Sequence, residues 1–283
     1  MQWMKSLSSE DPDLLRVKQW VLRRMNHVKT RPAGVSDWQR GCPELIPSLR
    51  SSAVWDVGLF PWVPVIEAAF PAIREELLAL RGQIGFQPYR APSWASDNLA
   101  SDGVGSKSTD AGNWNVFYLS LHNMDFAENR RRCPQTLAAV QAVAGQYDHC
   151  FFSALSPHAH ITKHNGPTNK KLRCHLPLVV GGPSAVMRVG DDRVTLSEGK
   201  CLIFDDSFQH EAWNGDDTSR ITLIFDVWHP DLSIKERKFL GFLQNAQMKA
   251  QKKAIEGSGD TDNFFSIIDK AAALPVDDKE LWS

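Results

Sequence analysis

Cysteine is scarce in this sequence, and the cysteines present show no spacing that would hold a metal or a disulfide framework. Five cysteines stand among 283 residues, without a C-x-x-C pair or a dense cluster. An odd number of widely spaced thiols is typical of reduced, mostly buried side chains. The pattern therefore argues against a small disulfide-stapled scaffold and favours a reducing compartment.

Long hydrophobic runs are also missing. No stretch approaches the ~20 apolar residues that cross a bilayer, and residues 1–5 lack the apolar core of a secretory signal. The sequence therefore predicts a cytoplasmic protein with no membrane partner.

An excess of basic charge, the usual mark of a protein that tracks a phosphate backbone, is absent as well. The chain has 32 Lys and Arg against 33 Asp and Glu, a formal net charge of -1. Nucleic acid is therefore not an expected partner. A chain of 283 residues with 42% hydrophobic content can bury a large core without a staple, so an ordinary globular protein is expected.

Helical periodicity marks several segments that flank the middle of the chain. Apolar residues recur at helical spacing in residues 13–24, 65–80, 133–144, 233–250 and 264–273. Ser233 and Glu236 have the spacing of a capping box at the start of the fourth segment. A Gly/Ser/Asp joint from Gly257 precedes the last one, so residues 257–283 are predicted to form a flexible tail with a short helix.

Residues 93–112 are rich in Ser, Asp, Gly and Ala, a composition that buries little apolar surface. They are predicted to form a mobile surface loop. Both a lid and a plain disordered insertion remain open as interpretations.

Short β-rich runs fill the second half of the chain. They span residues 151–155, 174–180, 185–189, 193–196, 201–204 and 220–228, with Gly-containing turns between them. Many short strands at close spacing indicate a mainly β fold with flanking helices, a double-stranded β-helix of the cupin-like jelly-roll type. Residues 1–256 are expected to form one catalytic domain, with its jelly-roll core at 110–232 and a helical scaffold before it.

Several imidazoles and guanidinium groups stand among these apolar runs, where unpaired polar groups are costly to bury. His164 and His210 lie forty-six positions apart and can meet from neighbouring strands. Ferrous iron in oxygenases is usually held by two imidazoles and a carboxylate. The pattern therefore predicts a non-haem iron site, although a single strand histidine is more often structural.

Several ordered segments of the chain form a pattern that points to a known family. They are Gly112-Asn113-Trp114, Cys133-Pro134-Gln135-Thr136, His164-Asn165-Gly166-Pro167-Thr168-Asn169, Leu172-Arg173-Cys174-His175, Glu198-Gly199-Lys200, Phe204-Asp205-Asp206-Ser207-Phe208-Gln209-His210-Glu211-Ala212-Trp213 and Asp226-Val227-Trp228-His229-Pro230-Asp231-Leu232. Together they resemble the catalytic domain of the aspartyl/asparaginyl β-hydroxylases, which are iron(II) and 2-oxoglutarate dependent oxygenases. The resemblance implies that Fe(2+), 2-oxoglutarate and O2 are the cofactor and cosubstrates.

The resemblance also assigns the metal ligands. It implies that His164 and His210 bind iron, and that Gly166 stands where related oxygenases carry the acid. Water is then expected at the third protein position. Asp205 or Asp206 is the alternative ligand, although such a pair before a strand more often forms a turn.

By the same resemblance, Arg220 holds the distal carboxylate of 2-oxoglutarate, which suits a planar fork that binds two oxygens at once. Ser153, Arg173 and His175 are implied to contact the cosubstrate, and Trp114 to border its pocket. Arg173 and His175 are two positions apart and so share a strand face. A surface ion pair is the competing interpretation of Arg173.

The leading hypothesis is hydroxylation of an unactivated carbon, with an aspartyl or asparaginyl β-carbon in a peptide, a protein or a related small molecule as the first candidate. A hydroxy-fatty-acid or lipid substrate is a second candidate, although it would call for a membrane attachment that the sequence does not show. Because Gly166 cannot ligate, a 2-oxoglutarate-dependent halogenase is one alternative. A non-catalytic jelly-roll module that binds an anion or metal is the other. Lys107 is the sole cation where the family would carry a substrate-binding arginine before Trp114, so the substrate stays open, as does the oligomeric state. His160 is expected to be structural rather than a ligand.

Overall fold

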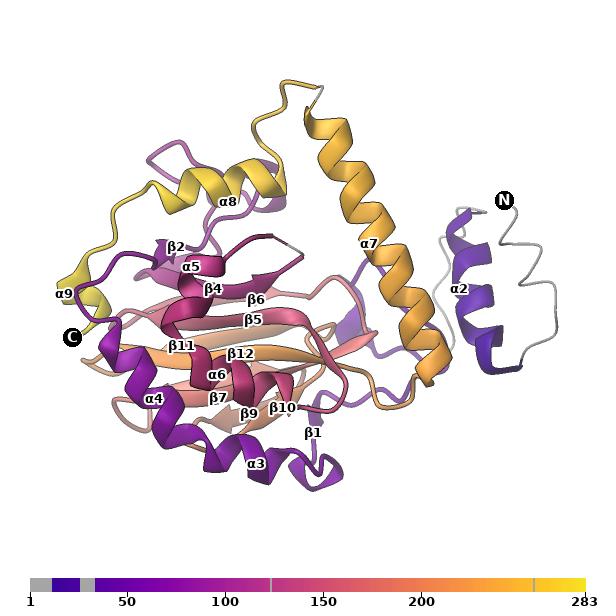
Figure 1. Ribbon diagram of the computed structural model, residues 1–283, viewed down its shortest axis with the longest axis horizontal. Coiled ribbons are helices and arrows are strands. Elements are labelled where there is room, and N and C mark those ends of the chain that lie inside the picture. The colour runs from indigo at the N-terminus through magenta and orange to yellow at the C-terminus, as the bar shows by residue number, and fades with distance from the viewer. Residues whose placement is uncertain (1–11, 26–33, 123, 257) are drawn as a thin grey trace.

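Two antiparallel sheets pack face to face in the computed structural model, which describes residues 12–25, 34–122, 124–256 and 258–283 (Figure 1). The larger sheet runs β1 (Val54–Trp55), β10 (Leu202–Phe204), β7 (Lys171–Val179), β12 (Arg220–Trp228), β5 (Gln146–Leu155), β4 (Trp114–Leu121) and β2 (Gln87–Pro88). The smaller runs β3 (Thr109–Ala111), β6 (His160–His164), β11 (His210–Asn214), β8 (Ala185–Val189) and β9 (Asp192–Thr195). The predicted jelly-roll class is confirmed.

Alternation along the strands divides the larger sheet into an outer apolar face and an inner polar one. On β12, Leu223 and Phe225 are completely buried in the largest hydrophobic cluster, together with Phe152 of β5. Helices α3 (Val63–Ala68), α4 (Phe70–Ala79) and α6 (Pro134–Gln141) pack on this outer face (Figure 1). Strand residues that lie next to Leu223, Phe225 and Phe152 in the sequence point in the opposite direction and therefore face the smaller sheet.

The helix predicted at 65–80 is divided into α3 and α4, which meet at Ala69. Pro71 explains the break, because it lacks an N–H and its ring clashes with the carbonyl four residues earlier. The predicted helices at 13–24 and 133–144 correspond to α2 (Leu15–Met25), preceded by a short 3-10 turn, and to α6, preceded by α5 (Ala127–Arg132).

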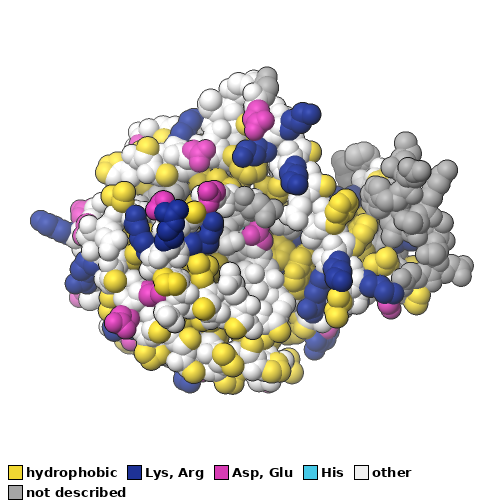
Figure 2. All heavy atoms as spheres, in the orientation of Figure 1, with side chains coloured by type: hydrophobic (Ala, Val, Ile, Leu, Met, Phe, Trp, Pro, Cys, Tyr) yellow, Lys and Arg dark blue, Asp and Glu magenta, His cyan; other side chains and the backbone are white. Residues whose placement is uncertain are grey.

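Helix α7 (Ile234–Glu256) begins with the predicted capping box. The Ser233 N–H donates to Glu236 Oε2 at 2.8 Å, and the Glu236 N–H donates to Ser233 Oγ at 3.2 Å. Figure 2 shows apolar and cationic side chains along this helix, and Phe242 is 64% exposed. Among the helices that the structure describes, none combines the length and apolar character needed to cross a membrane.

The predicted short helix near the C-terminus is present as α8 (Phe264–Ala272), and α9 (Asp278–Leu281) follows it. Both helices pack on the domain, since Ile267, Ile268 and Leu281 are buried. The Ser219 N–H also donates to the Ser283 carbonyl at 3.0 Å. The sequence predicts a flexible tail here, whereas residues 258–283 cover part of the larger sheet.

The segment 93–112, predicted as a mobile surface loop, contains a short 3-10 turn (Ser93–Ala95) and strand β3. Ser106 is fully buried, and its N–H donates to the Ala91 carbonyl at 2.8 Å. β3 pairs with β6 on the edge of the smaller sheet. Composition alone missed this strand because its partners lie some fifty residues away.

Candidate active site

His164 and His210 face each other across paired strands at the inner side of the smaller sheet. They are direct cross-strand partners in β6 and β11, and their ring centroids lie 4.1 Å apart. We call these two residues the histidine pair. The structure thus brings together the two predicted metal ligands.

Hydrogen bonds fix the tautomer of both rings. His164 Nδ1 lies 2.8 Å from the Thr162 carbonyl, and His210 Nδ1 lies 2.9 Å from the Phe208 carbonyl. A carbonyl can only accept, so each Nδ1 carries the proton and each Nε2 keeps a lone pair. Burial lowers the pKa of both imidazoles, which keeps them neutral at pH 7. Two neutral Nε2 atoms are suitable ligands for a divalent transition metal.

His160 does not join the histidine pair, as predicted, and a β-bulge is the reason. The register shifts between His210 and Ala212, so His160 pairs with Trp213 on the outer face. Its ring stacks on Trp213 with centroids 5.0 Å apart, and its Nδ1 lies 2.8 Å from Asp110 Oδ1.

Arg220 is a buried cation that forms no ion pair with any described residue. It is 3% exposed, and its guanidinium donates to the Trp213 carbonyl at 3.2 Å. Burial lowers the pKa of Arg220 to about 10, which still leaves it charged at pH 7. A buried charge without a counterion is costly, so the arrangement favours a bound anion.

Polar side chains around Arg220 are also left without protein partners. His175 Nδ1 and Thr222 Oγ1 are buried and make no hydrogen bond within the described part of the chain. Thr222 is the direct cross-strand partner of Ser153, whose Oγ accepts from Trp114 Nε1 at 2.9 Å. Ser153, His175, Trp114 and Arg220 therefore border one inner region, and their contact with a cosubstrate stays a prediction.

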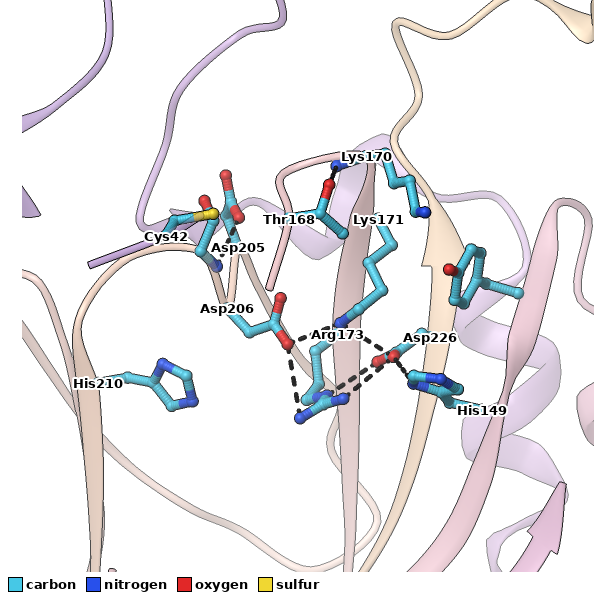
Figure 3. A network of polar contacts seen from close by, with 12 residues as sticks. Cys42, His149, Thr168, Lys170, Lys171, Arg173, Asp205, Asp206, His210 and Asp226 are labelled. Carbon is cyan, nitrogen blue, oxygen red and sulfur yellow. Dashed lines mark hydrogen bonds and ion pairs between the residues drawn. The ribbon is translucent and has the colours of Figure 1, made fainter. Parts of the chain in front are cut away.

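An ion-pair cluster of four side chains, Lys171, Arg173, Asp206 and Asp226, lies beside the histidine pair (Figure 3). Lys171 Nζ lies 2.6 Å from Asp206 Oδ2 and 3.0 Å from Asp226 Oδ2. Arg173 Nε donates to Asp226 Oδ1 at 2.8 Å. Figure 3 shows the His210 ring pointing towards this cluster.

Arg173 was predicted to contact the cosubstrate, with a surface ion pair as the competing interpretation. The structure places it in an ion pair that is largely buried, with its side chain 19% exposed and that of Asp226 fully buried. Burial would raise the pKa of Asp226, but the charges of Arg173 and Lys171 outweigh it and hold that pKa well below the ordinary value. A contact between Arg173 and the cosubstrate stays a prediction.

Asp206 occupies the space next to Gly166. A Cβ placed on Gly166 would lie 2.6 Å from Asp206 Cγ, and the Gly166 N–H donates to the Asp206 carbonyl at 2.6 Å. Asp206 Oδ1 is buried and has no partner among the residues described. Asp205 turns away, accepting the Ser207 N–H at 3.0 Å in the predicted tight turn. No set of three or more His, Cys, Asp or Glu side chains that could hold a metal is found in the described ranges.

Sequence reasoning missed Lys171, Thr222 and the role of Asp226. A signal for Lys171 was available, because positions 171, 173 and 175 alternate along β7 and are all basic. The partnership with Asp226 was not readable, since it joins residues more than fifty positions apart.

Comparison with known proteins gives a consistent set of relatives. A family model described as Aspartyl/Asparaginyl beta-hydroxylase matches residues 67–230, more than half of the chain. The chain is 36% identical over 184 residues to the ornithine lipid ester-linked acyl 2-hydroxylase of Rhizobium tropici, covering 64% of this chain and 62% of that protein. It is 44% identical over 214 residues to human aspartyl/asparaginyl beta-hydroxylase, covering 72% of this chain and 26% of that protein. This chain thus spans less than two thirds of the length of either relative.

Proposed function

We propose, from the premise that this chain belongs to the aspartyl/asparaginyl β-hydroxylase family, that it is an iron(II)/2-oxoglutarate-dependent dioxygenase that hydroxylates an unactivated carbon. Ferrous iron with O2 would supply the oxidation when bound, and 2-oxoglutarate would be consumed to succinate and carbon dioxide. The protein contributes binding, orientation and exclusion of water.

The residues present fit these groups. His164 and His210 offer two neutral Nε2 atoms, which supports them as the protein ligands of iron. Arg220 is the proposed partner of the distal carboxylate of 2-oxoglutarate. Ser153, with Arg173 and His175 at the inner face, is proposed to complete the cosubstrate pocket beside Trp114.

The observation that carries the proposal is the burial of Arg220 without an acidic partner. A guanidinium that is 3% exposed and bonded only to a carbonyl is stabilised when a carboxylate binds it. The neighbouring His175 Nδ1 is also buried without a partner among the described residues, so it is free to hydrogen-bond the same ligand. A module that bound nothing would gain no compensation for burying this charge.

The structure gives a reason to disfavour the halogenase alternative. Halide binding would require room for an anion beside the histidine pair on the side of Gly166. The Asp206 carboxylate borders that space, and its charge would repel a halide, whereas a neutral water can donate a hydrogen bond to it. We therefore propose that hydroxylation, with water at the third protein position, is the chemistry of this site.

Two substrate classes remain as proposals. An aspartyl or asparaginyl β-carbon, in a peptide or protein or in a related small molecule, is the first, supported by the human relative. The acyl chain of an amino-acid-derived lipid is the second, supported by the Rhizobium tropici relative, of which this chain covers the larger share.

We propose that residues 1–256 act as one catalytic domain, to which the packed helices α8 and α9 add a cover. A reducing compartment such as the cytoplasm is proposed because all five cysteines are free thiols, and four of them are buried.

The direct test is turnover of 2-oxoglutarate without a substrate. Protein loaded with ferrous iron is expected to release succinate and consume O2, slowly, and at a rate that increases when a substrate from a peptide and lipid panel is added. Mass spectrometry of the product should show a gain of one oxygen. If the iron-loaded wild-type protein released no succinate, both without substrate and with every member of the panel, the proposal would be overturned.

A further inference from the structure

A cavity of about 320 Å³ lies apart from the histidine pair and is lined by charged side chains of both signs. Its walls come from Tyr89 and Arg90 after β2, from residues 102–109, and from the C-terminal segment 274–280. We call it the Arg90 cavity. Two of these segments, residues 102–109 and 274–280, lie in stretches whose composition predicts flexibility.

Arg90 is the strongest sign of a ligand in this cavity. Its side chain is 9% exposed; Nη1 donates to the Tyr89 carbonyl at 3.1 Å and Nη2 to Asp102 at 2.8 Å. Its Nε is buried and has no partner among the described residues. A buried charged donor left unsatisfied is costly, so an acceptor supplied by a ligand would stabilise it.

Further side chains of both charges line the same cavity as Arg90. Lys107 adds a second cation, and Asp277 and Glu280 add two carboxylates. Among the described residues, the carboxylate of Glu280 accepts only from Asn113 Nδ2, at 3.0 and 2.9 Å, and so has acceptor capacity left for a cation. Asp102 also lines the cavity, but it already pairs with Arg90. Among the described residues, Lys107 and the two other carboxylates form no ion pair, so a ligand with one carboxylate and one ammonium group matches them.

The Arg90 cavity adjoins the proposed cosubstrate pocket. Trp114 belongs to both, since it lines this cavity while its Nε1 donates to Ser153 Oγ. Tyr89 stacks on Trp114 with ring centroids 3.7 Å apart. On the other side, Thr109 of the cavity lies in β3, which pairs with the β6 strand that ends at His164.

We propose that the Arg90 cavity binds the zwitterionic end of the substrate, an amino acid or an amino-acid-derived head group, while the carbon to be oxidised lies at the histidine pair. The carboxylate pairs with Arg90 and Lys107, and the ammonium group with Glu280 and Asp277. The role as a substrate subsite rests on the proposed function, whereas zwitterion binding does not. A free amino acid and an amino-acid-derived lipid head group share this chemistry.

Calorimetric titration of the whole chain with three probes tests the proposal. Nα-acetyl-L-ornithine carries both charges, its methyl ester only the ammonium group, and Nα,Nδ-diacetyl-L-ornithine only the carboxylate. The first is expected to bind at least tenfold more tightly than the others. Arg90→Met is expected to weaken binding of the zwitterion and of the diacetyl probe about tenfold, and Glu280→Gln to weaken binding of the zwitterion and of the methyl ester.

Lys107→Met is the second cation variant, because its side chain is partly exposed and its loss leaves the Arg90–Asp102 pair intact. Lys252→Met, in a separate cavity between α7 and α8, is the matched control and should bind every probe as the wild type does. Equal binding of all three probes, absence of zwitterion binding at about 10 mM, or insensitivity to all three cavity variants would each overturn the proposal.

Two further measurements are needed. One distinguishes a lipid head group from a free amino acid as the ligand, and the other separates zwitterion binding from the proposed enzymatic function. Co-sedimentation with phosphatidylcholine vesicles containing ornithine lipid, against plain vesicles, reports a lipid head group, and the soluble probe reports a free amino acid. Binding to the vesicles or to the soluble probe supports the proposal. If the protein binds neither, the proposal is contradicted. 2-Oxoglutarate binding is measured in parallel. Its absence from the wild type would refute the proposed function while the zwitterion result stands.

Discussion

The carboxylate of Asp206 lies where a side chain on Gly166 would have to go, with a Cβ at that glycine 2.6 Å from Asp206 Cγ. Lys171 holds this carboxylate by an ion pair that is completely buried. Position 166 is thus a glycine for a steric reason, because Asp206, in the turn between β10 and β11, occupies the space that a side chain there would need.

Gly166→Ala is expected to destabilise the fold by ~1 to 3 kcal/mol, because the added methyl group overpacks against a carboxylate that Lys171 holds in place. Urea denaturation measures the change in the free energy of unfolding. Gly241→Ala is the control, since its Cβ would meet only Trp228, at 3.7 Å, in ordinary contact. Equal effects of the two substitutions would contradict the packing argument.

Arg220→Met should affect affinity and stability in opposite directions. Loss of a charge-assisted contact costs ~1.5 to 3 kcal/mol, so the affinity for 2-oxoglutarate should fall roughly tenfold to over a hundredfold. Without 2-oxoglutarate the variant should be the more stable protein, because a buried unpaired guanidinium has been removed.

Thermal unfolding with and without 2-oxoglutarate measures both effects of Arg220→Met. Arg193→Met is the control: its exposed guanidinium lies over the Trp213 ring, on the outer face. An unchanged apparent Michaelis constant for 2-oxoglutarate in Arg220→Met would remove this residue from the cosubstrate pocket.

His164→Ala and His210→Ala are each expected to abolish succinate release with the fold intact, because one imidazole cannot hold a competent ferrous ion. Circular dichroism reports the fold. His160→Ala is the matched control on the same strand, since its ring faces Trp213 and Asp110 instead. Near-normal turnover by either first variant would show that its histidine is not a ligand.

Asp205 gives a pH dependence of stability. Burial raises the pKa of Asp205 to about 7, so the folded state binds this proton more tightly than the unfolded state. The stabilisation is complete below about pH 4 and is lost as pH rises to about 7, on the order of 2 to 4 kcal/mol. Asp205→Asn should remove that loss, which urea denaturation at pH 5 and pH 8 would detect.

Asp217→Asn, at a side chain that is 95% exposed, is the control and should keep the pH dependence of the wild type. If Asp205→Asn retained that dependence too, then Asp205 would not be the group that titrates.

Several elements could be predicted from sequence because their signals are local. The capping box of Ser233 and Glu236 needs only three positions, and the break at Pro71 was readable although it was not predicted. Strand β6 was missed because its short sequence is polar, and its burial comes from partners in β3 and β11. The packing of α8 and α9 likewise depends on surfaces far away in the chain.

The residues of the site likewise divide into those that the sequence predicts and those whose positions depend on distant parts of the chain. Motif spacing and resemblance brought His164, His210 and Arg220 together, and the structure places them on the inner faces of the two sheets. The β-bulge that turns His160 outward cannot be read from spacing, because strict alternation would put it on the same face as His164. The ion pair of Lys171 with Asp226 depends on strand register in the same way.

The central claim is that two neutral imidazoles, without a protein carboxylate, hold the metal. Bound 2-oxoglutarate then supplies the negative charge that a side chain provides elsewhere, so metal and cosubstrate should stabilise each other's binding. Calorimetric titration of manganese(II) with and without 2-oxoglutarate is the most direct measurement. We expect ~1 to 3 kcal/mol of positive coupling, equal in both directions. The same metal affinity in both titrations would mean that a carboxylate, Asp205 or Asp206, already completes the site.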